Sequence, residues 1–177
     1  MNPLKFITKI ALVCFILSSA TIEAQKFKGL DKSPMDAVWY PISNREPNKS
    51  IRVIYSRPQL KDRLLSALAP EGKVWRTGAN EATNITFYKD MKIAGKAIKA
   101  GEYSLFTIPG EKEWTIILSK DVNVWGAYSY NEANDALRIM VPVSSGEPLE
   151  AFSMAFSEDG TLNLGWDTVR VAIPITE

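Results

Sequence analysis

The feature that most constrains the fold is a series of short apolar runs, rich in β-branched and aromatic residues, that continues from residue 50 to the C-terminus. In the first run Ile51, Val53 and Tyr55 alternate with their neighbours, and Pro58 ends the run. We expect further strands over residues 83–88, 91–93, 97–98, 103–108, 114–119, 137–143, 152–156, 162–166 and 169–175. Turn residues such as Pro109-Gly110, Ser145-Gly146 and Trp166-Asp167 separate most of them. Many short strands at this spacing predict a mostly β fold, an antiparallel β-sandwich or jelly roll.

Four leucines at helical spacing predict one short helix within this β pattern. Leu60, Leu64, Leu65 and Leu68 fall on one face of a helix over residues 59–69, which Pro70 and Gly72 would end. It is the only helix that the sequence predicts with a clear period.

Residues 25–49 precede the series and differ from it, because three prolines interrupt them. We expect this stretch to wrap the domain as an arm, with Ala37–Tyr40 able to pair as an edge strand. The pattern predicts a single domain over residues 50–177, since neither an internal repeat nor a second boundary is visible.

The first 24 residues resemble a secretory signal peptide. Lys5 and Lys9 are followed by an apolar run over residues 10–17 and by small residues, with cleavage expected after Ala24 or after Ala20. A lipid anchor on Cys14 is less favoured, because apolar sequence continues past it. The run is too short to span a bilayer, which needs about 20 residues. We therefore expect an exported protein, periplasmic or extracellular, with no membrane insertion after cleavage.

Two absent residue types exclude several classes of function. The chain has no histidine and one cysteine, Cys14, which lies in the predicted signal peptide. A disulfide framework, a Cys or Cys/His zinc site, a His-ligated haem, a cysteine nucleophile and a Ser-His-Asp triad are thereby excluded from the mature chain. We predict no cofactor and no metal site. The 21 basic and 20 acidic residues nearly balance and form no basic block, so nucleic acid is not expected as a partner.

The segment Trp75–Glu81 is the first candidate site, because it combines several polar groups within seven residues. Arg76 offers a planar guanidinium to a carboxylate, phosphate or sugar, Asn80 a donor and an acceptor, and Glu81 a general acid or base. The alternative is structural: Arg76 and Glu81 pair with each other, Trp75 fills the end of the sandwich, and Asn80 caps a turn.

The second candidate is an aromatic stretch, residues 125–130, in a loop between strands. Trp125, Tyr128 and Tyr130 resemble the aromatic platforms that stack on sugar rings or peptides. The alternative is a small apolar core beneath a long loop.

Long motifs of the chain resemble the domain-of-unknown-function 2911 family. They are Tyr55-Ser56-Arg57-Pro58, the segment 72–83, the segment 100–110, Glu113-Trp114 and Trp125-Gly126-Ala127-Tyr128. The resemblance covers residues 50–175, and it implies an exported β domain from a Gram-negative bacterium. It implies no activity and no catalytic residue.

Three functions follow as hypotheses. The first is a binding module for a small polar ligand or glycan, bound by Trp75, Arg76, Asn80 and Glu81 and walled by Trp125 and Tyr128. The second is a carboxylate-dependent hydrolase or lyase acting on carbohydrate, with Glu81 as acid or base and Arg76 as electrostatic stabiliser. Such chemistry needs two carboxyl groups about 5–9.5 Å apart, and the candidates for the pair are Glu81, Glu102, Asp121 and Asp135. The third is a structural or interaction domain with no ligand.

Overall fold

The structure is a computed structural model that describes residues 25–177. The predicted signal peptide, residues 1–24, lies outside the described residues. The chain divides into two compact units, and the larger, Asp31–Glu177, contains every strand of the described part. It therefore includes most of the stretch that the sequence predicts to be an arm. Residues 25–30 belong to the other unit and have no regular secondary structure. Among the described residues, no helix is long and apolar enough to cross a membrane.

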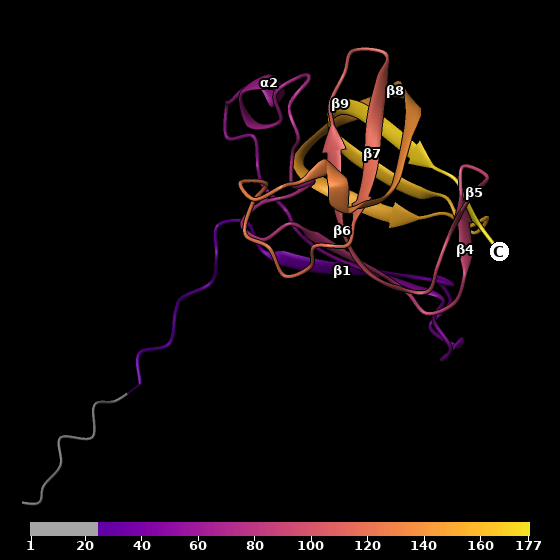
Figure 1. The fold of residues 1–177 in the computed structure, drawn as a ribbon. Coiled ribbons are helices and arrows are strands. Elements are labelled where there is room, and N and C mark those ends of the chain that lie inside the picture. The colour runs from indigo at the N-terminus through magenta and orange to yellow at the C-terminus, as the bar shows by residue number, and fades with distance from the viewer. Residues whose placement is uncertain (1–24) are drawn as a thin grey trace, which may run out of the picture. The chain divides into compact units, whose positions relative to one another are not determined.

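Ten antiparallel strands build the larger unit, seven of them in one curled sheet (Figure 1). In spatial order the large sheet contains β1 (Met35–Tyr40), β2 (Ile51–Ser56), β3 (Thr83–Phe87), β6 (Gly101–Ile108), β7 (Glu113–Ser119), β8 (Asp135–Phe156) and β9 (Leu162–Ile173). The small sheet contains β10 (Ile175–Thr176), β4 (Met91–Ile93) and β5 (Lys96–Ile98). The predicted fold class, mostly antiparallel β and sandwich-like, is confirmed. The edge strand expected at residues 37–40 is β1.

Alternation along the strands decides which face is covered. In β2, Ile51, Val53 and Tyr55 are buried in the core, whereas Arg52 and Ile54 point to the other face and are half-buried. The same alternation recurs in β3. The outer face of β2 and β3 is therefore left to polar and half-exposed side chains.

Strand β8 is a single bent strand of 22 residues. Its first half pairs with β7 and its second half with β9, and the register with β9 shifts after Ser145 and again after Leu149. The turn predicted at Ser145-Gly146 is therefore wrong, because bulged pairing carries the strand through a bend instead. Likewise β9 continues through Trp166-Asp167, where Asp167 takes a positive φ of 49°.

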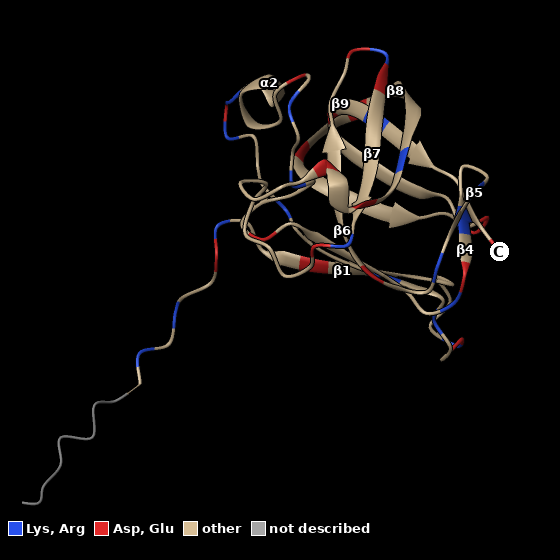
Figure 2. Cartoon of the chain, viewed as in Figure 1, with Lys and Arg blue, Asp and Glu red and all other residues tan. Residues whose placement is uncertain are grey.

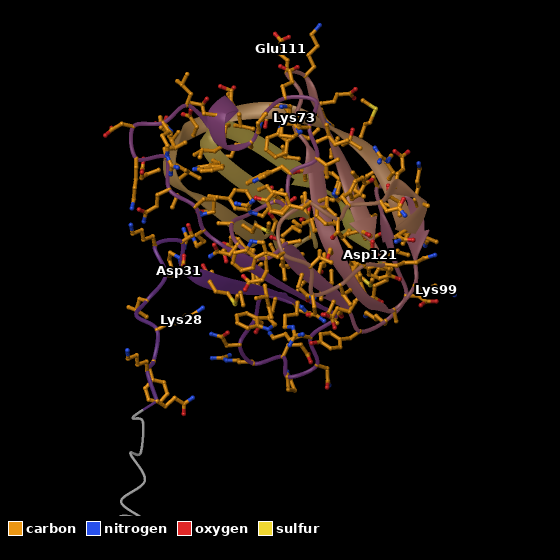
Figure 3. All side chains as sticks on the ribbon, turned by 60° about the vertical axis from the view of Figure 1, so that its left-hand side comes forward. Lys28, Asp31, Lys73, Lys99, Glu111 and Asp121 are labelled. Carbon is orange, nitrogen blue, oxygen red and sulfur yellow. The ribbon has the colours of Figure 1, made fainter. Side chains whose placement is uncertain are left out.

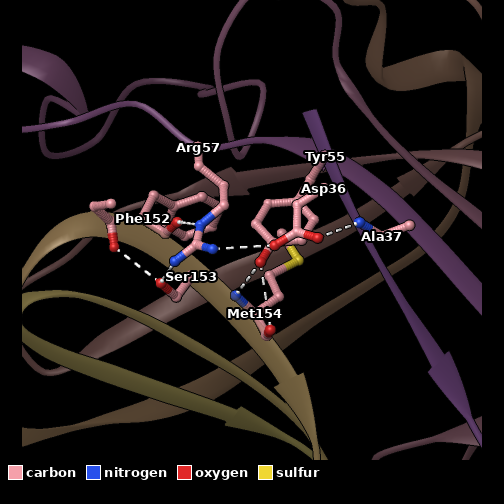
Figure 4. A network of polar contacts seen from close by, with 8 residues as sticks. Asp36, Ala37, Tyr55, Arg57, Phe152, Ser153 and Met154 are labelled. Carbon is pink, nitrogen blue, oxygen red and sulfur yellow. Dashed lines mark hydrogen bonds and ion pairs between the residues drawn. The ribbon is translucent and has the colours of Figure 1, made fainter. Parts of the chain in front are cut away.

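A polar clasp joins the β1–β2 end of the sheet to the second half of β8 (Figure 4). The guanidinium of Arg57 donates to the Phe152 carbonyl at 3.1 Å, to Ser153 Oγ at 2.7 Å and to Asp36 Oδ2 at 3.1 Å. The Tyr55 hydroxyl accepts from the Met154 amide at 2.8 Å. Backbone bonds continue the junction, since the Phe152 amide donates to the Pro58 carbonyl at 2.9 Å. The curled sheet is thus closed along this edge.

An aromatic cluster lies at the centre of the core. The Trp75 ring stacks on Trp166 with centroids 5.6 Å apart, and it meets Trp114 and Phe152 edge-on at 6.0 and 5.1 Å. All four side chains are buried. Aromatic pairs in such geometries add about 0.5–1.5 kcal/mol each beyond the burial of their area. Trp75 is therefore a core residue.

The helix is shorter than its leucine spacing predicts. Helix α2 covers Leu65–Leu68 only, and the prediction of residues 59–69 is wrong in extent. The Leu60 amide donates to the Glu150 carbonyl at 2.9 Å, which recruits this part of the chain to β8. Lys61 and Asp62 then take positive φ angles of 49° and 62°, which a right-handed helix excludes.

Basic and acidic residues are interspersed along the strands and loops (Figure 2). Lys99 and Glu111, labelled in Figure 3, are exposed and point outward from the surface. Such an interspersed surface presents no single extended field of one sign in the views shown.

Candidate functional site

The segment 72–83 is held by backbone pairing at both ends. Trp75 exchanges two backbone hydrogen bonds with Thr107 of β6, at 2.7 and 2.9 Å. Glu81 forms an isolated bridge with Trp125, and the adjoining Ala82 amide donates to the Val124 carbonyl at 3.0 Å. The segment therefore connects the core to the long loop that follows β7.

Between these ends the chain turns tightly. Thr77 and Asn80 take positive φ angles of 54° and 62°, and asparagine is among the residues that tolerate this region best. The Thr83 hydroxyl donates to the Thr77 carbonyl at 2.6 Å. A Cβ on Gly78 would lie 3.1 Å from the Ser56 carbonyl oxygen, so the turn also packs closely against β2. The small residues of this segment thus serve its close packing.

The structure separates the predicted site residues in this segment. Trp75 is in the core, and the Asn80 carbonyl accepts from the Gly126 amide at 3.0 Å. Arg76 and Glu81 form no ion pair in the described part of the chain. Arg76 Nε is buried without a hydrogen-bond partner, whereas Glu81 is exposed. Glu81 is the one side chain of the six predicted site residues that lines the cavity described next.

Trp125 and Tyr128 are exposed, at 61% and 86%. The Tyr128 ring lies over Gly126, where a Cβ would be 2.6 Å from the ring. Other residues of the same loop are covered: Ala127 and Tyr130 pack on Phe106 and Ile117 of the outer sheet face. The loop thus has a small apolar core beneath it and presents two aromatic rings to solvent. Trp125 is placed beside Glu81 by the backbone bridge.

A cavity of about 400 Å³ lies on the outer face of the sheet, and we call it the Glu81 groove. Its lining comes from β1, β2, β3, β6 and two loops: Met35, Arg52, Ile54, Tyr55, Ser56, Glu81, Ala82, Asn84, Glu102 and Asn123. A guanidinium, two carboxylates and two amides therefore line one concavity that also has an apolar wall. Concave sites of this size with a few converging polar groups are the usual form of a ligand site.

Strand register explains why these polar groups meet. Trp39, Arg52, Thr86 and Glu102 are successive partners across β1, β2, β3 and β6. Ile54, Asn84 and Ser104 form the neighbouring row. Residues directly opposite on one face have Cβ atoms about 4.5–5.5 Å apart, so each row is a line of touching side chains.

Few contacts within the protein occupy the groove's polar groups. Asn84 Nδ2 donates to Glu102 Oε1 at 2.5 Å. Arg52 Nη2 donates to Thr86 Oγ1 at 3.4 Å, a long bond, and Arg52 Nε is buried without a partner. In the described part of the chain, neither Arg52 nor Glu81 forms an ion pair. The groove thus has donors and acceptors available to a ligand.

A second cavity of about 590 Å³ adjoins the groove and shares Arg52 with it. We call it the Trp39 surface, and its lining is Trp39, Pro47, Asn48, Lys49, Ser50, Arg52, Tyr88 and Lys89. Two aromatic residues of this surface, Trp39 and Tyr88, are 46% and 53% exposed.

Two other carboxylates considered in the sequence are held by the protein itself. Asp121 accepts two hydrogen bonds from Asn134 Nδ2, at 2.9 and 2.8 Å. Asp135 accepts from the Tyr130 hydroxyl at 2.8 Å and pairs with Arg138. Within residues 25–177 no group of three or more acidic residues is arranged to hold a metal ion.

The family described as "Protein of unknown function (DUF2911)" matches residues 33–175. The chain belongs to the DUF2911 family. The match contains every residue that lines the Glu81 groove and the Trp39 surface. The resemblance of the sequence motifs is confirmed, and the match also includes β1. No curated protein and no solved structure matches the DUF2911 chain.

Of the polar residues that line the groove, the sequence pointed to Glu81 and, as a candidate carboxylate, to Glu102, but it did not point to Arg52 or Asn84. Arg52, Asn84 and Glu102 are far apart along the DUF2911 chain and meet only through strand register. A signal exists in the outward positions of β2, β3 and β6, where polar residues alternate with buried apolar ones. Which outward positions share a row, however, depends on a register that no single strand specifies.

Proposed function

We propose that the DUF2911 chain is a glycan-binding module whose site is the Glu81 groove. The observation that carries this proposal is the convergence of Arg52, Glu81, Asn84 and Glu102 in one cavity with an apolar wall. Sugar hydroxyls act as donors and acceptors at once, and they match a site that mixes carboxylate, amide and guanidinium groups. The apolar wall, with Ile54 and Met35, suits the C–H faces of a sugar ring.

A second function is favoured by one specific observation. Glu81 and Glu102 line the same groove, and a pair of carboxyl groups across a cleft is the arrangement that glycoside hydrolysis needs. In this alternative Glu102, held by the Asn84 amide, is the partner of Glu81, and Arg76 has no part because it does not line the groove.

A glycan array followed by calorimetric titration tests the binding proposal. We expect wild-type protein to bind at least one oligosaccharide. Glu81→Gln should weaken that binding by about 10–100-fold, because hydrogen bonds to charged groups are worth about 1.5–3 kcal/mol. Asn84→Ala should weaken it by about 2–10-fold, because a hydrogen bond from a neutral amide is worth about 0.5–1.5 kcal/mol. Glu111→Gln, at the exposed turn between β6 and β7, is the control and should bind as wild type. Absence of binding to the whole array, or full binding by the two groove variants, would refute the proposal.

Turnover separates the two functions. If the bound oligosaccharide is hydrolysed, Glu81→Gln and Glu102→Gln should each abolish product formation while leaving the melting temperature within a few degrees of wild type. Binding without product supports the module.

We also infer that the chain is exported. The support is the order of basic, apolar and small residues over residues 1–24. Mass spectrometry of the protein recovered from the periplasm or medium should give a chain that begins at Gln25 or Thr21. A cytoplasmic, uncleaved chain would refute export.

A further inference from the structure

We propose that the Trp39 surface is a second subsite, continuous with the Glu81 groove, that takes a sugar carrying a carboxylate. This inference rests on the proposed glycan function and adds to it the charge and the length of the ligand. The two cavities share Arg52, so a chain of sugar rings lying along the outer face of the sheet contacts both.

The first line of support is charge. Lys49, Arg52 and Lys89 line the Trp39 surface, and no acidic residue does. Lys89 is already paired with Glu177. In the described part of the chain, neither Lys49 nor Arg52 forms an ion pair with a carboxylate, so both cations can pair with a ligand. An anionic ligand supplies the missing charge.

The second line of support is the state of the Arg52 side chain. It is half-buried between β1 and β3, and its one hydrogen bond to a described residue is the long contact with Thr86. Its Nε is buried and unpartnered, which raises the cost of leaving the charge without a counter-ion. A carboxylate at the Arg52 guanidinium would make the charge-assisted bonds that the protein does not supply.

Lys49 also has capacity for such a ligand. Its Nζ donates to the Pro41 carbonyl at 2.7 Å and to the Ser43 carbonyl at 2.6 Å. An ammonium has three donors, so one remains. Its two backbone bonds hold the ammonium at the cavity wall, and this pre-organisation lowers the entropy lost when an anion binds.

The third line of support is aromatic. Trp39 lies directly across from Arg52 in the strand register, and both Trp39 and Tyr88 expose about half of their surface. Exposed rings beside cations suit a ligand that has apolar C–H faces and an anionic group, which is the chemistry of a uronic acid residue. An inorganic anion makes no use of the rings.

The test compares matched ligands. The probes are tetramers of galacturonic, mannuronic and glucuronic acid, each alongside the same tetramer after its carboxyl groups are reduced to alcohols. We expect at least one acid form to bind about tenfold or more tightly than its reduced form at low salt, and the preference to shrink as salt rises. Arg52→Gln and Lys49→Gln should each reduce the preference, whereas Lys73→Gln, which changes charge away from both cavities, should preserve it.

The outcomes separate this inference from the function on which it rests. If acid and reduced tetramers bind equally, or if the preference survives in both Arg52→Gln and Lys49→Gln, the acidic subsite is refuted and the glycan site stands. If no tetramer binds and the glycan array is also negative, both proposals are refuted. Glu81→Gln should weaken binding of the reduced forms and should not lower the preference for the acid forms, because it removes a negative charge from the neighbouring groove. Should Arg52→Gln fail to fold, Lys49→Gln and the comparison of ligands on wild-type protein still decide.

Discussion

Replacing Tyr55 with phenylalanine removes one hydroxyl from the clasp that closes the sheet. That hydroxyl accepts from the Met154 amide at 2.8 Å and lies 3.4 Å from the Met154 carbonyl (Figure 4). Both residues are buried, so no water replaces the lost partner. The Met154 amide is then left inside the protein without an acceptor.

The loss of stability in Tyr55→Phe comes from the Met154 amide that is left without an acceptor, rather than from the removal of the hydroxyl itself. A buried donor left unsatisfied costs about 1–3 kcal/mol, and the long carbonyl contact adds little, so we expect about 2 kcal/mol. In a domain of this size 1 kcal/mol shifts the melting temperature by about 2–4 °C, so Tyr55→Phe should melt about 4–8 °C below wild type. The ring keeps its edge contact with Phe152 at 5.7 Å, and no cavity forms.

Tyr103→Phe is the matched control. Its hydroxyl donates to the Lys99 carbonyl at 3.1 Å, and Lys99 is exposed, so water can take over that acceptor. We expect a loss of about 0.5–1 kcal/mol. Thermal and urea unfolding of both variants measure the difference. If Tyr55→Phe is no less stable than Tyr103→Phe, the Met154 amide is not an essential partner in the clasp, and the reasoning is wrong.

The remaining predictions concern the core, the loop and pH. Trp75→Ala should lower stability by about 3–5 kcal/mol in urea unfolding because it empties the aromatic cluster, whereas Trp125→Ala, at an exposed ring, should change it by about 0.5 kcal/mol or less; equal losses would contradict the core assignment. Burial, with help from the hydrogen bond to Asp135, raises the pKa of Tyr130 from 10.0 to about 12. Because the folded pKa lies above the unfolded one, this contribution to stability is complete below pH 10 and is lost as pH rises toward 12. Unfolding titrations from pH 9 upward should therefore show a shallower alkaline loss in Tyr130→Phe than in wild type, and identical slopes would contradict it.

The sequence predicts the strands better than it predicts their connections. Alternation and turn residues are local features of the sequence. The strands β2, β3, β6 and β7 can therefore be recognised without knowledge of the fold. The bend of β8 cannot be recognised in this way, because a bulge forms only where the pairing with the partner strand accommodates an extra residue. The predicted length of the helix is wrong for a related reason. The leucines do recur at helical spacing, but the backbone hydrogen bond from Leu60 to Glu150 draws the first half of the segment to β8, so that half is not helical.

The candidate site likewise has one part that the sequence reveals and another that only the fold brings together. Glu81 is recognisable as polar chemistry among small residues, yet Arg52, Asn84 and Glu102 join it only through the register of three strands. The sequence does not decide the role of Trp75, because a tryptophan beside charged residues is equally typical of the wall of a binding site and of a hydrophobic core. Only its stacking on Trp166 distinguishes the two.

Under the proposed function, the segment Trp75–Glu81 has two tasks that a sequence cannot separate. Its residues from Trp75 to Asn80 anchor the loop, through the core ring, the bridge to β6 and the left-handed turn. Glu81 follows at once, and the bridge to Trp125 fixes its backbone at the edge of the groove. Such support of the backbone suits a binding group, because it restricts where the Glu81 side chain can lie and so lowers the entropy lost on meeting a ligand. A structural role and a binding role of the segment are therefore compatible. Substitutions in the anchor, residues 75–80, should displace Glu81, whereas Glu81→Gln should leave the anchor intact.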